Sequence, residues 1–244
     1  MGGRGAERLG EPRRTAAGRP SAHPRSPSAT CALPREATRA DIDEVVASFA
    51  RAARFADLAG YQAVEIQGSH GYLVHEFLSP LVNRRTDKYG GSAHNRMRMP
   101  LRVVRAVRAA FPQEKPVFFR ITATDWIAGG LALDKSTAFA KELAAVGIDL
   151  LDVSSGLVVR DTAARPPVRQ GVHVAFADAL KTASGLAVAP AGQIEDLSLA
   201  GGLVASGRAD AVMIGRALLR DPYLPLRGLI AGPAAWPAQY RRAL

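Results

Sequence analysis

Short apolar segments and amphipathic helical segments alternate along most of this chain. The expected strands lie at residues 63–66, 116–121, 149–153, 186–189 and 211–214. Between and after them, helices are expected at residues 38–59, 99–110, 134–146 and 174–182, at 196–205, and after Pro222. Each strand-and-helix unit takes roughly 30–40 residues, which is typical of right-handed β-α units and a parallel sheet. The sequence therefore predicts an α/β fold.

The first expected helix has a defined start. Thr38 and Asp41 have the spacing of a capping box, with Asp in place of the usual Glu, and Ala59-Gly60 supplies a stop. Upstream of it, residues 1–33 are rich in Gly, Pro, Ser and Arg and show no apolar periodicity. Such a segment buries too little apolar surface to offset its ordering entropy, so we expect it to be disordered. A transit-type targeting peptide and upstream sequence joined to a shortened gene are the alternatives.

The basic composition does not by itself indicate nucleic-acid binding. The net charge is +10, but residues 1–35 hold seven arginines against two glutamates, a net of +5, and the rest of the chain shows no basic stripe interleaved with aromatic residues. The single cysteine, Cys31, excludes an intramolecular disulfide and a multi-cysteine metal cluster. No apolar run approaches the roughly 18 residues of a membrane span. We expect a cytoplasmic protein whose partners are small molecules rather than nucleic acid, membranes or metals.

Polar residues follow the first expected strand directly. His70 and Tyr72 lie just past it, beside Gly68 and Gly71, which allow a sharp turn. The carboxyl ends of parallel strands are where α/β proteins place their chemistry. An imidazole N–H can bind a carbonyl oxygen, and a phenol can deliver a proton. The alternative is that both side chains only pack against the strand end; His75, further on, is expected to be structural.

A second group of residues suits an anionic ligand. Arg120 lies in an otherwise apolar strand, so its charge must face a polar ligand or pair with an acid such as Asp152 or Asp125. The last two expected strands end in Ala191-Gly192-Gln193 and Gly215-Arg216. Backbone N–H groups at a glycine beside a cation suit a phosphate, although these glycines could also serve only tight turns. Neither a G-x-G-x-x-G nor a Walker-type motif is present.

Four separated segments carry a family resemblance. GSHGYLVHEFLSPLVNRRTDKYGGS, VFFRITATDW, LLDVSSG and ASGRADAVMIGRALLRDP together resemble the Old Yellow Enzyme family of FMN-dependent ene-reductases and NADPH dehydrogenases, from about Pro34 to about Leu229. The resemblance implies a TIM (β/α)₈ barrel whose fourth to eighth strands match the five expected here. It thus predicts an N-terminally truncated, partial TIM barrel over residues 34–244.

The resemblance also implies roles for individual residues. Tyr72 would donate a proton, while Gln67 and His70 would hold an enone-type alkene; Gln67 stands where related members mostly have His. Four residues would bind FMN: Arg120, Gly192, Gly215 and Arg216.

NAD(P)H would be the electron donor. Because a partial barrel leaves an open sheet edge, we expect instability, a homo-oligomer or completion by another chain. The alternative is a non-catalytic remnant or subunit that does not hold FMN by itself.

Overall fold

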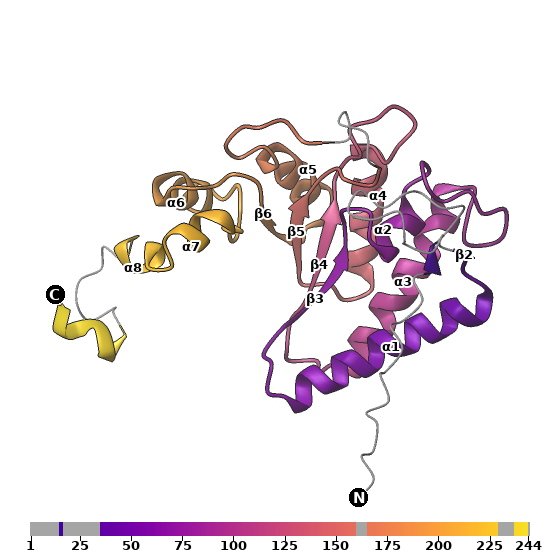
Figure 1. Ribbon diagram of the computed structural model, residues 1–244, viewed down its shortest axis with the longest axis horizontal. Helices are drawn as coiled ribbons and strands as arrows, with labels where there is room; N and C mark the ends of the chain where they lie inside the picture. Colours follow the sequence, from indigo (N-terminus) through magenta and orange to yellow (C-terminus); the bar gives the residue numbers. More distant parts are fainter. Residues whose placement is uncertain (1–14, 17–34, 160–164, 229–236, 244) are drawn as a thin grey trace, which may run out of the picture.

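Four parallel strands form the central sheet of the computed structural model, which describes residues 15–16, 35–159, 165–228 and 237–243. They follow one another across the sheet in chain order (Figure 1). The strands are β3 (Val64–Gly68), β4 (Val117–Thr122), β5 (Leu150–Ser154) and β6 (Ala187–Pro190). Sequential neighbouring parallel strands joined by helices are the arrangement from which β/α barrels are built.

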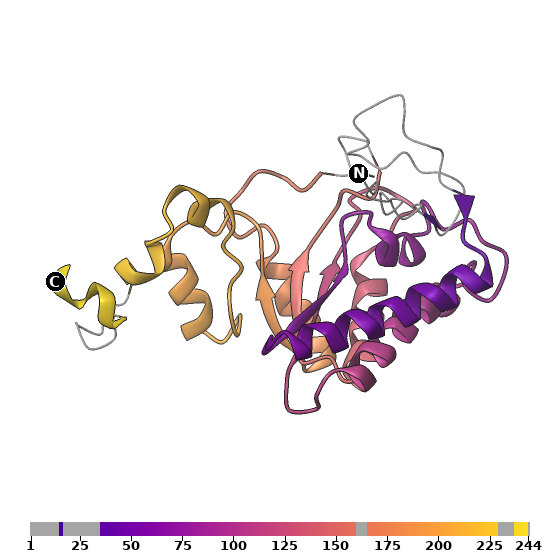
Figure 2. The same cartoon turned by 60° about the horizontal axis from the view of Figure 1, so that its bottom comes forward.

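Helices connect the strands and extend beyond the last one. The helices before β6 are α1 (Arg39–Leu58), α2 (Leu73–Leu78), α3 (Ala93–Ala110), α4 (Leu133–Ala145) and α5 (Val174–Ser184). After β6 come α6 (Leu197–Ala205), α7 (Arg216–Arg220), α8 (Leu224–Gly228) and a 3₁₀ helix, η3 (Ala238–Ala243). Figures 1 and 2 show α6, α7 and α8 on the far side of β6 from α1 and α3. None of the described helices is both long and apolar enough to cross a bilayer.

The start of α1 is the capping box that the sequence predicts. The Thr38 hydroxyl accepts a hydrogen bond from the Asp41 backbone N–H at 3.1 Å, and the Asp41 carboxylate accepts one from the Thr38 N–H at 2.8 Å. Two backbone donors of the first turn are thereby satisfied. One side of α1 then packs against α3, with Ile42 fully buried.

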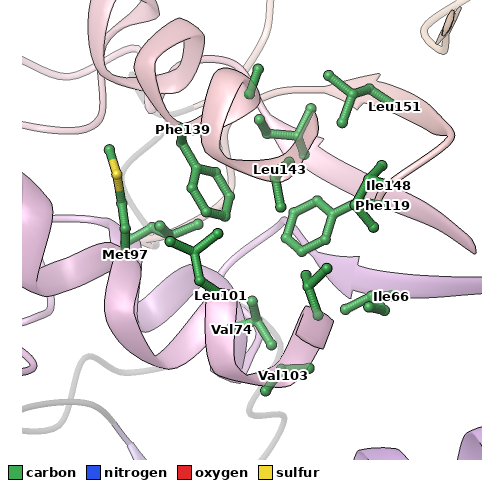
Figure 3. Close-up of a cluster of buried hydrophobic side chains, with 14 of the residues drawn as sticks. Ile66, Val74, Met97, Leu101, Val103, Phe119, Phe139, Leu143, Ile148 and Leu151 are labelled. Carbon is green, nitrogen blue, oxygen red and sulfur yellow. The ribbon is translucent and has the colours of Figure 1, made fainter. Parts of the chain in front are cut away.

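The main core lies between the sheet and the helices on one of its faces. Ile66, Phe119 and Leu151, from three neighbouring strands, point toward side chains of α3 and α4 (Figure 3). Phe119 meets Phe139 edge to face, with ring centroids 5.5 Å apart. Alternate residues of a strand point to opposite faces. The residues between these apolar ones therefore face the other side of the sheet.

The polar row on that other side is set by the strand register. Gln67 lies opposite Arg120, Arg120 opposite Asp152, and Asp152 opposite Ala189. Three polar side chains in one row of a parallel sheet form no apolar core. They mark this face as the one available to a polar ligand.

The strand expected at residues 211–214 is not among the described strands, so that prediction is wrong. The segment does run beside β6, because the Met213 N–H donates to the Pro190 carbonyl at 3.1 Å. However, the N–H groups of Asp210 and Ala211 both donate to the single carbonyl of Val188. A parallel ladder also needs N–H groups of β6 that donate back to this segment, but Pro190 has none and the Val188 N–H donates to the Asp210 carboxylate at 2.9 Å.

The helix expected at residues 99–110 begins earlier, at Ala93. Ser92 caps it by accepting a hydrogen bond from the Asn95 N–H at 3.2 Å. The two short helices α2 and α7 were also not expected.

The predicted disorder of residues 1–33 lies outside the described residues, apart from β1 (Thr15–Ala16). This two-residue strand pairs in parallel with β2 (Arg35–Glu36).

Candidate active site

A cavity of about 460 Å³ lies at the carboxyl ends of β4, β5 and β6. Its walls come from the ends of these strands, from His173 before α5, and from residues 191–195 and 213–217. Its volume is within the range of small-molecule sites, roughly 300–1,000 Å³. The cavity is therefore the first candidate for a ligand site in the described part of the chain.

The four residues predicted to bind a cofactor all line this cavity. Arg120 comes from β4, Gly192 follows β6, Gly215 precedes α7 and Arg216 begins it. A Cβ added at Gly215 would meet no other atom within 4 Å, so the backbone there borders open space. The fold thus brings together residues that lie far apart in the sequence.

Arg120 pairs with Asp152 on the neighbouring strand. Its Nε lies 3.0 Å from Asp152 Oδ2, and Asp152 is only 4% exposed. Burial raises the pKa of Asp152 to about 6, and the guanidinium opposes that rise. Both side chains line the cavity. Arg120 thus has the acidic partner considered above and also faces the ligand space.

The charges around the cavity fit an anionic ligand. Glu195 is bound to Arg220 at 2.8 Å, and Asp152 is bound to Arg120. Within the described ranges, no acidic side chain pairs with Arg216. Among the described residues, the Arg216 guanidinium is thus left without an acidic partner, next to the open backbone at Gly215. This charge balance and the cavity volume fit a phosphate-bearing cofactor such as FMN.

Gln67, His70 and Tyr72 lie one strand away from the cavity, at the end of β3. The His70 Nε2 lies 2.5 Å from the hydroxyl of Ser154, which lines the cavity. The Gln67 side chain accepts a hydrogen bond from Ser69. Tyr72 is 39% exposed, at the N-cap position of α2. The structure therefore joins the two predicted groups of residues through the contact between His70 and Ser154.

A buried network around His75 holds the turn that carries these residues. Gly71 donates its N–H to His75 Nδ1 at 2.9 Å, so the ring hydrogen must lie on Nε2, which faces Asp125 Oδ1 at 3.1 Å. Asp125 Oδ2 accepts from the Ser79 hydroxyl at 2.6 Å and from the Leu131 N–H at 2.7 Å. Burial alone would raise the pKa of Asp125, but the hydrogen bonds from His75 and Ser79 lower it. The fully buried His75 is structural, as expected.

A second buried network, around His173, was not predicted. The Trp126 indole N–H donates to Ser155 Oγ at 2.8 Å, Ser155 Oγ lies 2.8 Å from His173 Nε2, and His173 Nδ1 lies 3.0 Å from the Ala191 carbonyl. A carbonyl only accepts, so Nδ1 carries the hydrogen and Nε2 accepts from Ser155. Burial lowers the pKa of His173 to about 4, which keeps the ring neutral at pH 7. The residues of this network lie far apart in the sequence, so no local sequence pattern identifies them.

Comparison with known proteins identifies the family. The chain matches the family described as NADH:flavin oxidoreductase / NADH oxidase over residues 2–228, and it belongs to that family. This confirms the resemblance to the Old Yellow Enzyme family, whose cofactors are FMN and NAD(P)H. The match begins at residue 2 rather than near Pro34. The N-terminal segment therefore lies within the matched region, contrary to the extent expected from the resemblance.

Individual relatives indicate the same family. An NADPH dehydrogenase of Listeria welshimeri is 42% identical over 218 residues, which are 87% of this chain and 62% of that protein. The structure of a 2-naphthoyl-CoA reductase in complex with 2-naphthoyl-CoA is 31% identical with a TM-score of 0.76, over 83% of this chain and 31% of the other. Morphinone reductase in complex with tetrahydroNAD is 28% identical with a TM-score of 0.66, over 82% of this chain and 52% of the other. The fold is thus a partial TIM barrel, and the chain spans 62% of the length of its Listeria relative.

Proposed function

We propose that this chain binds FMN in the cavity at the carboxyl ends of β4–β6 and acts in the cytoplasm as an NAD(P)H-dependent oxidoreductase on activated alkenes such as enones. One observation carries the proposal. The four residues that the family resemblance assigns to FMN, Arg120, Gly192, Gly215 and Arg216, line a single cavity of about 460 Å³. Relatives named NADPH dehydrogenase and morphinone reductase support the choice of electron donor and reaction class.

The chain's own residues would divide the binding of FMN between them. Arg216 and the backbone at Gly192 and Gly215 would hold the phosphate, because a guanidinium can donate two parallel hydrogen bonds to phosphate oxygens. Arg120 would lie against the flavin ring, its guanidinium held in place by Asp152. When bound, FMN supplies hydride that originates from NAD(P)H. Residues 34–244 would form the FMN-binding region.

Residues at the end of β3 would bind and protonate the alkene. Gln67 and His70 would donate hydrogen bonds to the carbonyl oxygen of an enone, which favours addition of hydride at the β-carbon. The Tyr72 hydroxyl would give its proton to the α-carbon, so that one hydride and one proton add across the double bond. Because Tyr72 is partly exposed, it can regain its proton from water.

The substitution Tyr72→Phe tests this assignment. It should leave reduction of bound FMN by NAD(P)H unchanged and slow alkene reduction about a hundredfold, the usual size of a lost general acid. Rapid mixing can follow the two half-reactions separately. Tyr61→Phe, a change at an exposed tyrosine outside the site, is the matched control. Equal losses in both half-reactions would contradict the role of Tyr72.

The rival proposal is a non-catalytic remnant or subunit. It is supported by a sheet of four described strands and by coverage of 62% of the Listeria relative. It predicts that the purified chain takes up no FMN alone. Light scattering during gel filtration would show whether FMN uptake requires a homo-oligomer or a second chain that completes the barrel.

A further inference from the structure

The wall of the cavity just after β6 contains a turn that needs support. Gly192 has φ +97° and Gln193 has φ 55°, so two successive residues occupy the left-handed region. For Gln193 this conformation is unfavourable and persists only where the surroundings enforce it. Both residues line the cavity.

His173 contacts this turn in two ways. Its Nδ1 donates a hydrogen bond to the carbonyl of Ala191. Its ring also lies directly against Gly192, because a Cβ added there would come within 2.7 Å of His173 Nδ1 and of Val172 Cγ1. The adjoining Gly171 N–H donates to the Gly192 carbonyl at 3.1 Å. The segment before α5 thus clamps two successive carbonyls of the turn.

The hydrogen bond to Ala191 depends on the tautomer of His173. The Ala191 carbonyl can only accept, so the ring hydrogen lies on Nδ1 and the unprotonated Nε2 accepts from the Ser155 hydroxyl. The indole N–H of Trp126 donates to the same Ser155 oxygen, which is compatible with Ser155 giving its own hydrogen to Nε2. The opposite tautomer would leave the Ala191 carbonyl without this donor.

We propose that His173, which donates from Nδ1 to Ala191 and accepts at Nε2 from Ser155, is a positioning residue that holds the Ala191–Gly192 turn in the conformation that receives the cofactor. The proposal rests on FMN binding in this cavity. His173 does not need to touch the cofactor. It acts by keeping the backbone at Gly192 in place.

Two amide substitutions separate the two hydrogen bonds of the ring. In His173→Asn the amide nitrogen lies near the former Nδ1 and can still donate to Ala191. In His173→Gln the amide lies near the former Nε2, so the Ser155 contact is kept and the Ala191 bond is lost. Quenching of flavin fluorescence on titration of the full chain gives the dissociation constant of FMN.

The expected result is that H173N binds FMN within about twofold of the unaltered chain, whereas H173Q binds it roughly three- to tenfold more weakly, the effect of one lost hydrogen bond. Urea midpoints of the two variants should be similar. Equal FMN affinity of H173Q and the unaltered chain would overturn the proposal. So would losses of affinity that simply follow the losses of stability, because these would assign His173 a packing role only.

Nuclear magnetic resonance tests the same proposal without FMN. The ¹⁵N shifts of the His173 ring should show a protonated Nδ1 and an unprotonated Nε2. The Gly171 amide, which donates to Gly192, should exchange with solvent faster in H173Q than in H173N. The reverse tautomer, or equal exchange rates, would refute the proposal even if the chain binds no FMN. Failure of FMN uptake alone would contradict only the proposed function.

Discussion

Two buried histidines hold the two sides of the site in opposite ways. His75 accepts a hydrogen bond from the Gly71 N–H at Nδ1 and turns its Nε2 toward the Asp125 carboxylate. His173 donates from Nδ1 to the Ala191 carbonyl and accepts at Nε2 from the neutral Ser155 hydroxyl. The first supports the turn proposed to bind substrate, and the second supports the turn proposed to bind FMN.

The difference shows how the partners of a buried imidazole decide its behaviour. The buried Asp125 carboxylate helps to hold the turn at His75. Losing that charge, or leaving it unpaired, costs stability. Only neutral groups bind the ring of His173, so burial lowers its pKa to about 4. We therefore expect stability to depend on the Asp125 carboxylate at the turn held by His75, and on pH at the turn held by His173.

The largest effect should follow from Asp125→Ala. This change removes the acceptor of His75, Ser79 and Leu131 at a fully buried position. We expect the free energy of unfolding to fall by about 3–5 kcal/mol, because three buried hydrogen-bond donors lose a charged acceptor at about 1–3 kcal/mol each. Urea denaturation measures it. Asp125→Asn, which keeps one oxygen acceptor, should lose less. A loss below about 1 kcal/mol for the alanine variant would remove the contrast between the two histidines.

The second largest effect should be the loss of stability when acid protonates His173. The unfolded ring has a pKa of 6.5 and the folded ring one of about 4, so between these values the unfolded chain binds more protons. The neutral His173 ring therefore contributes fully to the free energy of unfolding above pH 6.5. This contribution, on the order of 3 kcal/mol, is lost as the pH falls to about 4. The carboxyl of Asp152, with a pKa raised to about 6, changes stability in the opposite direction.

The His173→Asn variant isolates this contribution because asparagine does not titrate. Urea denaturation between pH 7 and pH 4 should show the unaltered chain losing stability relative to the variant. Parallel curves for the two proteins would contradict a neutral, buried His173.

A smaller effect should distinguish two glycines of positive φ. Gly192 has φ +97° and no room for a Cβ beside His173, whereas Gly185 has φ +72° at the end of α5 and a Cβ there would meet nothing within 4 Å. Gly185→Ala should cost about 1 kcal/mol for the backbone conformation alone. Gly192→Ala should cost about 1–2 kcal/mol more, because the ring of His173 must move. Equal unfolding free energies would mean that His173 does not press on the turn.

The strands of the fold could be predicted closely from the sequence. The expected strands at 116–121 and 186–189 differ by one residue from Val117–Thr122 and Ala187–Pro190. Continuous apolar runs ended by turn residues specify a buried parallel strand. The segment at 211–214 is equally apolar, but pairing rather than composition defines a strand. The start of α3 was missed because its first turn is polar, although Ser92 could have indicated it.

The candidate site was predictable to a lesser extent. Arg120 is noticeable because a charge stands out in an apolar strand, and Gly192 because a glycine follows the end of one; both line the cavity. His173 was not found, because nothing in its local sequence indicates that its ring meets Ser155 on one side and Ala191 on the other. Long-range hydrogen bonds of this kind depend on how neighbouring loops pack, which periodicity does not report.

The proposed function depends on FMN binding in the cavity beside Arg216. Titration of the purified full chain with FMN, followed by the visible absorption spectrum, tests it most directly. We expect saturable uptake of one FMN per chain. Arg216→Ala should weaken it about tenfold or more through loss of a charge-assisted phosphate contact. Arg98→Ala, on the exposed side of α3, should leave it unchanged. A chain that remains colourless, or one that binds FMN equally well without Arg216, would contradict the proposed function.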